Sequence, residues 1–247
     1  MSAGLLIPLA QDGGPVIPDF GRGDDCIREN GNFCAQWFVD NFEERYWPRV
    51  VEHIELTLIA LAIGFVIAFA AALIAYRYTR FEMPFANVSA LFYTIPSIAF
   101  FQIMVPITGI GRLSIEIALV SYTLLILFRN TLTGLKEVPA DAREAAEGMG
   151  LTRRQTLTRV ELPLAMPAII AGIRVATVTT ISLATVAAFI TPLGLGAPIF
   201  NAIQTGANTD FFAAGALAII LALLADFIIV LIQRLVSPWM RARSRAT

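Results

Sequence analysis

Five long apolar segments constrain this chain more than any other feature of its sequence. A transmembrane helix needs about 20 predominantly apolar residues, and each segment is long enough. The segments are Ile54–Tyr76, Ala86–Thr108, Leu113–Leu132, Leu164–Ile190 and Phe211–Leu235. Only 15% of the 247 residues are charged and 57% are hydrophobic, a balance that excludes an ordinary soluble domain. The sequence therefore predicts an all-α membrane protein with about five spanning helices.

The basic residues are unevenly distributed among the segments that connect these spans. Arg77 and Arg80 follow the first span, five basic residues lie in the third connection, and the fourth connection has none. The tail of residues 237–247 contains three more arginines. Because cytoplasmic loops are enriched in Lys and Arg, we predict a multi-pass protein of the inner or plasma membrane, with its N-terminus outside and a cytoplasmic tail.

The head, residues 1–53, differs in charge from the rest of the chain. It holds four arginines and nine acidic residues, whereas residues 54–247 hold fourteen basic and ten acidic residues. Aromatic and apolar side chains recur near helical spacing over residues 35–53, and Trp37 and Trp47 suit a membrane–water interface. We predict an extracytoplasmic head with an interfacial helix before the first span; an extended linker is the alternative.

Cys26 and Cys34 lie eight residues apart in this head. If the head is outside the cell, a disulfide between them is plausible, and the alternative is two free thiols without a role. Two cysteines and the distant His53 do not supply the four ligands of a closed zinc site, so no metal site is expected. The formal net charge of −1 also argues against nucleic acid as a partner.

Proline and glycine interrupt two of the membrane segments. Pro96 and Pro106 predict a kinked or broken second span, either along a translocation path or as a harmless kink. Residues 199–202, in a Gly- and Pro-containing stretch, are expected to form a short re-entrant helix on the outer side. The candidates for lining the path are Tyr93, Thr94, Pro96, Ser97 and Asn130.

Two charged residues lie deep within the predicted spans. Arg174 is about 15 Å and Asp226 about 14 Å from the cytoplasmic side, at 1.5 Å per residue. Because their depths match, we predict an intramembrane ion pair; direct contact with the transported solute is the alternative. Glu55, Glu116 and Arg129 lie near span ends, from which their charged groups are expected to reach water.

The third connection, residues 133–163, contains a loop at residues 137–163 that predicts a helix–turn–helix. Residues 140–147 are strong helix formers, and Gly148 and Gly150 around Met149 allow a sharp turn. Thr152 and Gln155 have the spacing of a capping box for a second helix, which we expect to end before Pro163. A compact charged hairpin on the inner face suits docking into a groove on a soluble partner. An ordinary amphipathic connector is the alternative.

The same connection carries the pattern E-A-A, three residues, G, nine residues, V, one residue, L-P, from Glu144 to Pro163. This pattern resembles the EAA loop of permease subunits in binding-protein-dependent ABC importers. The segments Tyr93–Ser97, Gly109–Gly111, Leu127–Thr131 and Ala171–Arg174 resemble the branch that imports osmoprotectants. The resemblance covers about residues 53–236. It implies no role for residues 1–52, which depart from the common pattern. It implies that the loop docks on an ATPase subunit through Glu144, Ala145, Ala146, Gly148, Met149, Gly150 and Leu151.

The resemblance implies a fold of the type I ABC importer permease kind and transport of glycine betaine, choline, carnitine or proline by alternating access. The chain has no phosphate-binding loop, so ATP and Mg would be used by a partner ATPase, present in two copies. A second permease copy or paralogue, a separate extracytoplasmic substrate-binding protein and membrane lipid are the other expected partners. No cofactor bound by this chain and no catalytic residue are expected.

Several alternatives remain at this point. The same architecture could carry another cargo, such as amino acids, methionine or a thiol-betaine. An intramembrane enzyme would need clustered catalytic groups, but His53 is placed at an outer span edge and neither cysteine lies in a span. A membrane scaffold without transport activity would not need the full EAA pattern.

Overall fold

A computed structural model of the chain describes residues 25–236, and every element of secondary structure in that range is helical. The expectations for residues 1–24 and for the basic tail of residues 237–247 lie outside the described residues. The α-helices are α1 Asp25–Arg28, α2 Ala35–Asp40, α3 Trp47–Arg77, α4 Glu82–Thr94, α5 Ser97–Thr108, α6 Arg112–Lys136, α7 Ala140–Gly148, α8 Arg153–Thr156, α9 Leu162–Ala187, α10 Gly196–Thr205 and α11 Asn208–Val236. Two π-turns, Phe42–Tyr46 and Leu157–Glu161, and a 3-10 turn, Thr79–Phe81, complete the order.

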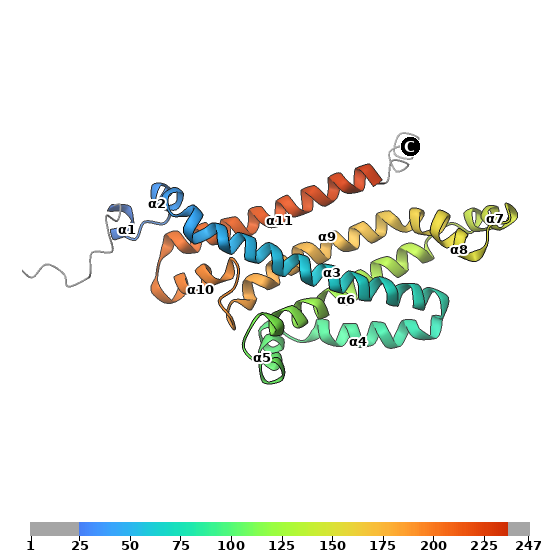
Figure 1. Ribbon diagram of the computed structural model, residues 1–247, viewed down its shortest axis with the longest axis horizontal. Coiled ribbons are helices and arrows are strands. Elements are labelled where there is room, and N and C mark those ends of the chain that lie inside the picture. The colour runs from blue at the N-terminus through green and yellow to red at the C-terminus, as the bar shows by residue number, and fades with distance from the viewer. Residues whose placement is uncertain (1–24, 237–247) are drawn as a thin grey trace, which may run out of the picture.

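Four continuous helical runs in the described range are long and apolar enough to cross a membrane: Phe42–Arg77, Arg112–Lys136, Arg153–Ala187 and Asn208–Val236. The remaining predicted span consists of α4 and α5, which meet at an angle of 101°. Counted as one broken span, this pair gives the five spans that the sequence predicts. In Figure 1 the long helices follow the long axis, with α7 and α8 at one end and α2 and α10 at the other.

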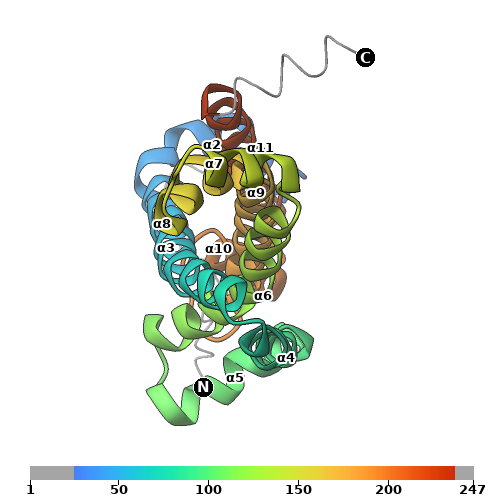
Figure 2. The same ribbon diagram turned by 90° about the vertical axis from the view of Figure 1, so that its right-hand side faces the viewer.

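The core is formed by α6 together with α3 and α9, which pack on it and on each other. Figure 2, viewed along the long axis, shows these helices around a common centre, with α4 and α5 outside them. Small residues let the helices approach closely. A Cβ on Gly64 of α3 would lie 1.9 Å from Thr123 Oγ1 of α6, and a Cβ on Gly172 of α9 would lie 2.6 Å from the Cβ of Asn130.

The chain enters the first span earlier than the sequence predicts. Residues 47–53, expected in an interfacial helix, form the first turns of α3 instead. The preceding aromatic residues do not simply rest at an interface, because Tyr46 is fully buried and packs with Trp37 and Phe38 against α11. Contact with α11 therefore fixes the direction in which the chain enters α3.

The prediction that the second helix of the hairpin ends before Pro163 is wrong. One helical run continues from Arg153 through the π-turn Leu157–Glu161 into α9, with Pro163 near the start of α9. A proline inside a helix removes a donor and collides with the carbonyl one turn earlier. The wider π-turn lies where that collision would occur, so the helix continues and joins the hairpin rigidly to the fourth span.

Candidate functional site

The turn of the hairpin between α7 and α8 is built around Gly150. This residue has φ +77°, and the amides of Gly150 and Leu151 donate to the carbonyl oxygens of Glu147 (2.9 Å) and Ala146 (3.1 Å). These two bonds form a Schellman motif, which closes a helix with a left-handed residue and favours glycine there. Gly148, expected to share the turn, is the last residue of α7 instead.

The residues of the EAA pattern divide between the two faces of α7. Ala146 is fully buried against the body of the protein, whereas Glu144, Ala145 and Gly148 are exposed. Met149, at the turn, is 72% exposed, and Leu151 is half-buried. The outward set offers a small, partly apolar surface at the tip of the molecule, with one carboxylate on it.

The predicted capping box at the start of α8 is confirmed. The amide of Thr152 donates to Gln155 Oε1 at 2.8 Å, and the amide of Gln155 donates to Thr152 Oγ1 at 3.4 Å. These two bonds satisfy amides that the first turn of a helix leaves without partners. Both ends of the hairpin turn are therefore fixed by local hydrogen bonds.

The predicted path residues Tyr93, Thr94, Pro96 and Ser97 lie together at the bend between α4 and α5. Pro96 is the residue before α5, and Tyr93 is 43% exposed. The carbonyl of Ile95, which the bend leaves without a helical partner, accepts a hydrogen bond from the Tyr122 hydroxyl of α6. The bend is thus a fixed feature held by the core.

Asn130 is not brought to this bend. It lies on α6 eight residues beyond Tyr122, which corresponds to about 12 Å along the helix. Its side-chain amide donates to the carbonyl oxygen of Ile126 at 2.8 Å, and its Cβ faces Gly172. In the described structure Asn130 mainly supports the contact between α6 and α9.

His53 is a residue whose role sequence reasoning missed. It is fully buried, its Nδ1 accepts from the amide of Leu195 (3.2 Å), and its Nε2 lies 3.1 Å from the carbonyl oxygen of Ile181. This network is satisfied by a neutral imidazole with its hydrogen on Nε2. Glu52 accepts from the amide of Gly194 at 2.7 Å, so α3 holds the loop that leads into α10.

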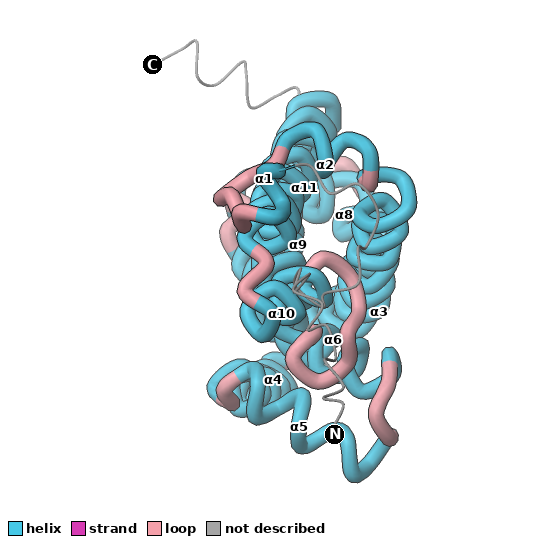
Figure 3. Tube along the Cα trace, turned by 90° about the vertical axis from the view of Figure 1, so that its left-hand side faces the viewer, coloured by secondary structure: helices cyan, strands magenta, loops and turns pink. Residues whose placement is uncertain are grey.

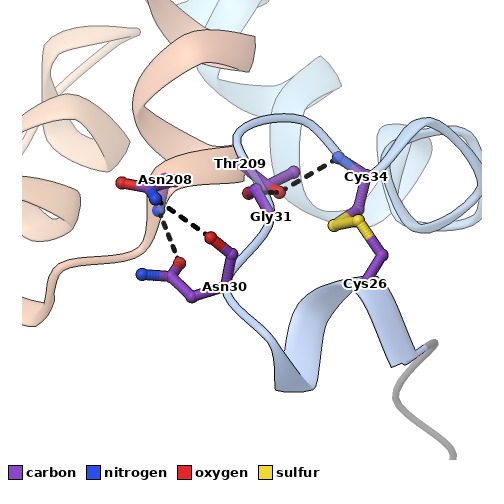
Figure 4. The surroundings of a disulfide bond; sticks show 6 residues. All are labelled: Cys26, Asn30, Gly31, Cys34, Asn208 and Thr209. Carbon is purple, nitrogen blue, oxygen red and sulfur yellow. Dashed lines mark hydrogen bonds between the residues drawn. A yellow bond between two sulfur atoms is a disulfide. The ribbon is translucent and has the colours of Figure 1, made fainter.

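Residues 26–34 of the head bind the start of α11, as Figure 4 shows. Cys26 and Cys34 form a disulfide, which closes a loop that contains Asn30. The side chain of Asn30 accepts from the amide of Asn208 (3.1 Å) and donates to the carbonyl oxygen of Gly206 (2.8 Å). The amide of Cys34 donates to Thr209 Oγ1 at 3.1 Å. This disulfide-closed loop, residues 26–34, therefore holds the connection between α10 and α11, at the end of the molecule viewed in Figure 3.

A buried carboxylate strengthens the same junction. Asp210 is 4% exposed and accepts two hydrogen bonds from Arg45, one of them to Oδ1 at 2.9 Å. The Tyr46 hydroxyl donates to Oδ1 at 2.6 Å. Because a buried carboxylate requires such partners, the two side chains fix the start of α11 against the entrance to α3.

Arg174 and Asp226 are brought together in the middle of α9 and α11. Arg174 Nε donates to Asp226 Oδ1 at 2.8 Å and Nη2 donates to Oδ2 at 2.9 Å, a bidentate pair. About a third of each side chain is exposed in the isolated chain. Bidentate geometry is the strongest arrangement for a guanidinium and a carboxylate, and it suits an apolar environment.

The expectation that Glu116 reaches water is wrong. The residue is 8% exposed, and its Oε1 lies 3.5 Å from Arg112 Nε on the same helix. Arg112 also binds Glu55 at 3.1 Å, so it links the start of α6 to α3. Glu116 was misplaced because its position near a span end does not reveal that α6 is buried on several sides.

Comparison with known proteins decides the family. Residues 50–242 match the family described as "Binding-protein-dependent transport system inner membrane component". The chain belongs to this family. The match includes the five predicted spans and the hairpin. It does not include the disulfide-closed loop, nor Arg45 and Tyr46, which bind Asp210.

Individual relatives are similar over most of their length. The chain is 32% identical over 191 residues to the choline transport system permease protein OpuBB of Bacillus subtilis, which covers 77% of this chain and 88% of that protein. It is 36% identical over 193 residues to the osmoprotectant import permease protein OsmW of Salmonella typhimurium, which covers 76% and 89%. Inward-facing structures of the MetNI methionine ABC transporter share the fold, with a TM-score of 0.66, 24% identity, and coverage of 76% of this chain and 94% of that one.

The chain is therefore the membrane-spanning permease subunit of an ABC importer and not an enzyme. The family implies that a separate ATPase hydrolyses ATP and that a substrate-binding protein delivers the cargo. It also agrees with the several apolar helices in placing the chain in the membrane as a multi-pass protein.

A first prediction concerns the hairpin turn. Gly150→Val should weaken binding of the ATPase, because a left-handed conformation costs a residue with a Cβ about 1–2 kcal/mol and the turn would change shape. Gly150→Asn is the control, since asparagine tolerates this conformation better. Co-purification of the ATPase with the permease measures the effect. Equal losses in both variants would show that backbone conformation is not the cause.

A second prediction concerns Arg174 and Asp226. Arg174→Ala and Asp226→Ala should each lower the yield of assembled transporter, because each leaves a charge in the membrane without its partner. The exchange of Arg174→Asp with Asp226→Arg should recover part of that yield. The losses are measured by detergent extraction and size-exclusion chromatography. Strictly additive losses in the double-mutant cycle would contradict the pairing. Recovered assembly without transport would indicate direct contact with cargo.

Proposed function

We propose that this permease moves small quaternary-amine osmoprotectants, such as glycine betaine, choline and carnitine, into the cell. The observation that carries the proposal is the identity of 32% to 36% with choline and osmoprotectant permeases over most of both chains. The arrangement of the helices is compatible with this function. The hairpin, which would contact the ATPase, lies at one end of the molecule. The helices are interrupted elsewhere, at the bend between α4 and α5 and at the loop before α10.

The proposed mechanism is alternating access driven by ATP and Mg bound to two ATPase subunits. Their closure would move the hairpin through Glu144, Ala145, Met149 and Gly150. The spans would then open outward and accept solute from the substrate-binding protein. The bend residues Tyr93 and Ser97 are proposed to line the path.

A complete transporter is proposed to contain a second permease, either another copy or a paralogue. Support comes from α11, which packs mainly on α9 and α10 within the described chain and exposes much of its apolar surface. A second subunit and lipid would cover this surface, because exposed apolar area of this extent is a feature of interfaces and membrane-facing helices.

The proposed orientation has the head outside and the hairpin in the cytoplasm. Two observations support it. The basic residues concentrate in the hairpin. The disulfide between Cys26 and Cys34 suits an oxidising compartment.

A third prediction tests the cargo. Cells that lack their own osmoprotectant uptake should accumulate labelled glycine betaine, choline or carnitine when they express this permease with its ATPase and binding protein. The control omits only the permease. Methionine, proline and a thiol-betaine complete the panel. Uptake restricted to methionine or proline would replace the quaternary-amine proposal while keeping the permease role, whereas uptake of the thiol-betaine alone would narrow it to that quaternary amine.

A fourth prediction tests the orientation. In intact cells, a maleimide that cannot cross membranes should label Cys26 and Cys34 after reduction, because the head faces outward. A variant with Cys26→Ser, Cys34→Ser and Met149→Cys should be labelled only in broken cells, since position 149 lies on the exposed hairpin turn. The opposite pattern would reverse the orientation.

A further inference from the structure

A cluster of three polar side chains lies where the hairpin meets the spans. The Tyr76 hydroxyl of α3 donates to Glu161 Oε1 at 2.6 Å, and Arg143 Nε of α7 lies 3.2 Å from the same oxygen. Glu161 is 7% exposed and sits in the π-turn that leads into α9. The cluster therefore joins the hairpin helix to the cytoplasmic ends of the first and fourth spans.

Arg143 also connects the cluster to α6. Its Nη2 donates to the carbonyl oxygens of Leu135 (3.1 Å) and Lys136 (3.3 Å), which end that helix. The last carbonyls of a helix have no partner within it and carry the negative end of its dipole, so a guanidinium is a favourable partner. One side chain of α7 thus binds two further helical segments at once.

The surroundings of the cluster are apolar. Leu135, Ala165 and Ile169 are buried beside it, and Tyr76 itself packs in this group, together with the partly buried Leu73, Leu157 and Leu162. In such surroundings the hydrogen bond from Tyr76 and the ion pair with Arg143 are both strong, and a carboxylate that loses its partners is strongly disfavoured. Glu161 therefore keeps its partners in any state in which it stays buried.

We infer that Tyr76, Arg143 and Glu161 are positioning residues that transmit movement of the coupling hairpin to α3, α6 and α9. The inference rests on the proposed function, because it takes α7 to be the element that the ATPase moves. A displacement of α7 pulls on the carbonyl end of α6 through Arg143 and on α9 and α3 through Glu161. These three helices form the core. The displacement therefore passes along continuous helices to the bend between α4 and α5 and to the loop before α10.

Two residues at the same end of the molecule provide matched controls. Tyr78, two residues beyond Tyr76, is 62% exposed. Glu82 forms an ion pair with Lys136 at 2.6 Å, and side-chain exposures of 29% and 46% place this pair in contact with solvent. Exposed ion pairs of this kind contribute little to stability. Glu82→Gln therefore makes the same substitution as Glu161→Gln at a position outside the cluster.

The experiment compares Tyr76→Phe and Glu161→Gln with Tyr78→Phe and Glu82→Gln. Each variant is purified with its ATPase, reconstituted in proteoliposomes and supplied with the binding protein. ATP hydrolysis and uptake of labelled glycine betaine or choline are measured together. We expect the two cluster variants to move about tenfold less solute per ATP, the factor that matches loss of one hydrogen bond to a charged group. The ATPase should co-purify normally, and the controls should match the unaltered transporter.

An unaltered ratio of solute to ATP in both cluster variants would overturn the inference. A lower thermal midpoint of the complex with the same ratio would also overturn it, because the cluster would then serve stability alone. If the unaltered transporter accumulates none of the solutes, the proposed cargo fails instead. In that case stimulation of ATP hydrolysis by the binding protein tests the cluster alone: its loss in the variants supports transmission, and its retention contradicts it.

Discussion

Peptide groups at every break in a membrane helix need hydrogen-bond partners, because hydrocarbon supplies none. In this protein neighbouring helices provide them as side chains. At the bend between α4 and α5 the Tyr122 hydroxyl donates to the carbonyl oxygen of Ile95. Before α10, His53 accepts from the amide of Leu195, and Glu52 accepts from the preceding amide. The irregular segments therefore depend on the α3–α6–α9 core, and their positions follow when the core moves.

The two ends of the core differ in how they are held. At the hairpin end, Arg143 and Glu161 connect α7 to helices that continue without interruption. The connections to α5 and α10 are short irregular segments that side chains of the core hold, Tyr122 at the first and Glu52 with His53 at the second. Movement of the hairpin, as proposed above, would thus pass through continuous helices before it reaches these irregular segments.

Much of this arrangement is predictable from sequence because its determinants are local. The length of each apolar segment predicts a span, and Pro96 predicts the bend between α4 and α5. The spacing of Thr152 and Gln155 predicts the start of α8. The matched depths of Arg174 and Asp226 predict their pairing for a similar reason, since depth is counted along a single helix. The roles of His53 and Glu161 could not be found this way. Their partners lie on other helices or, for His53, also in the loop before α10, 142 residues away, and no local pattern specifies which segments meet.

The disulfide-closed loop also bears on the order of assembly. Cys26 and Cys34 are eight residues apart, so their loop can close as soon as the head emerges, long before residues 206–210 are synthesised. Closure restricts the conformations of the loop in advance, which lowers the entropy lost when Asn30 later binds Asn208. The loop of residues 26–34 is thus a preformed receptor for the start of α11. Pairing of the loop with α11 is a late step, because Asn208 follows Asn30 by 178 residues in the chain.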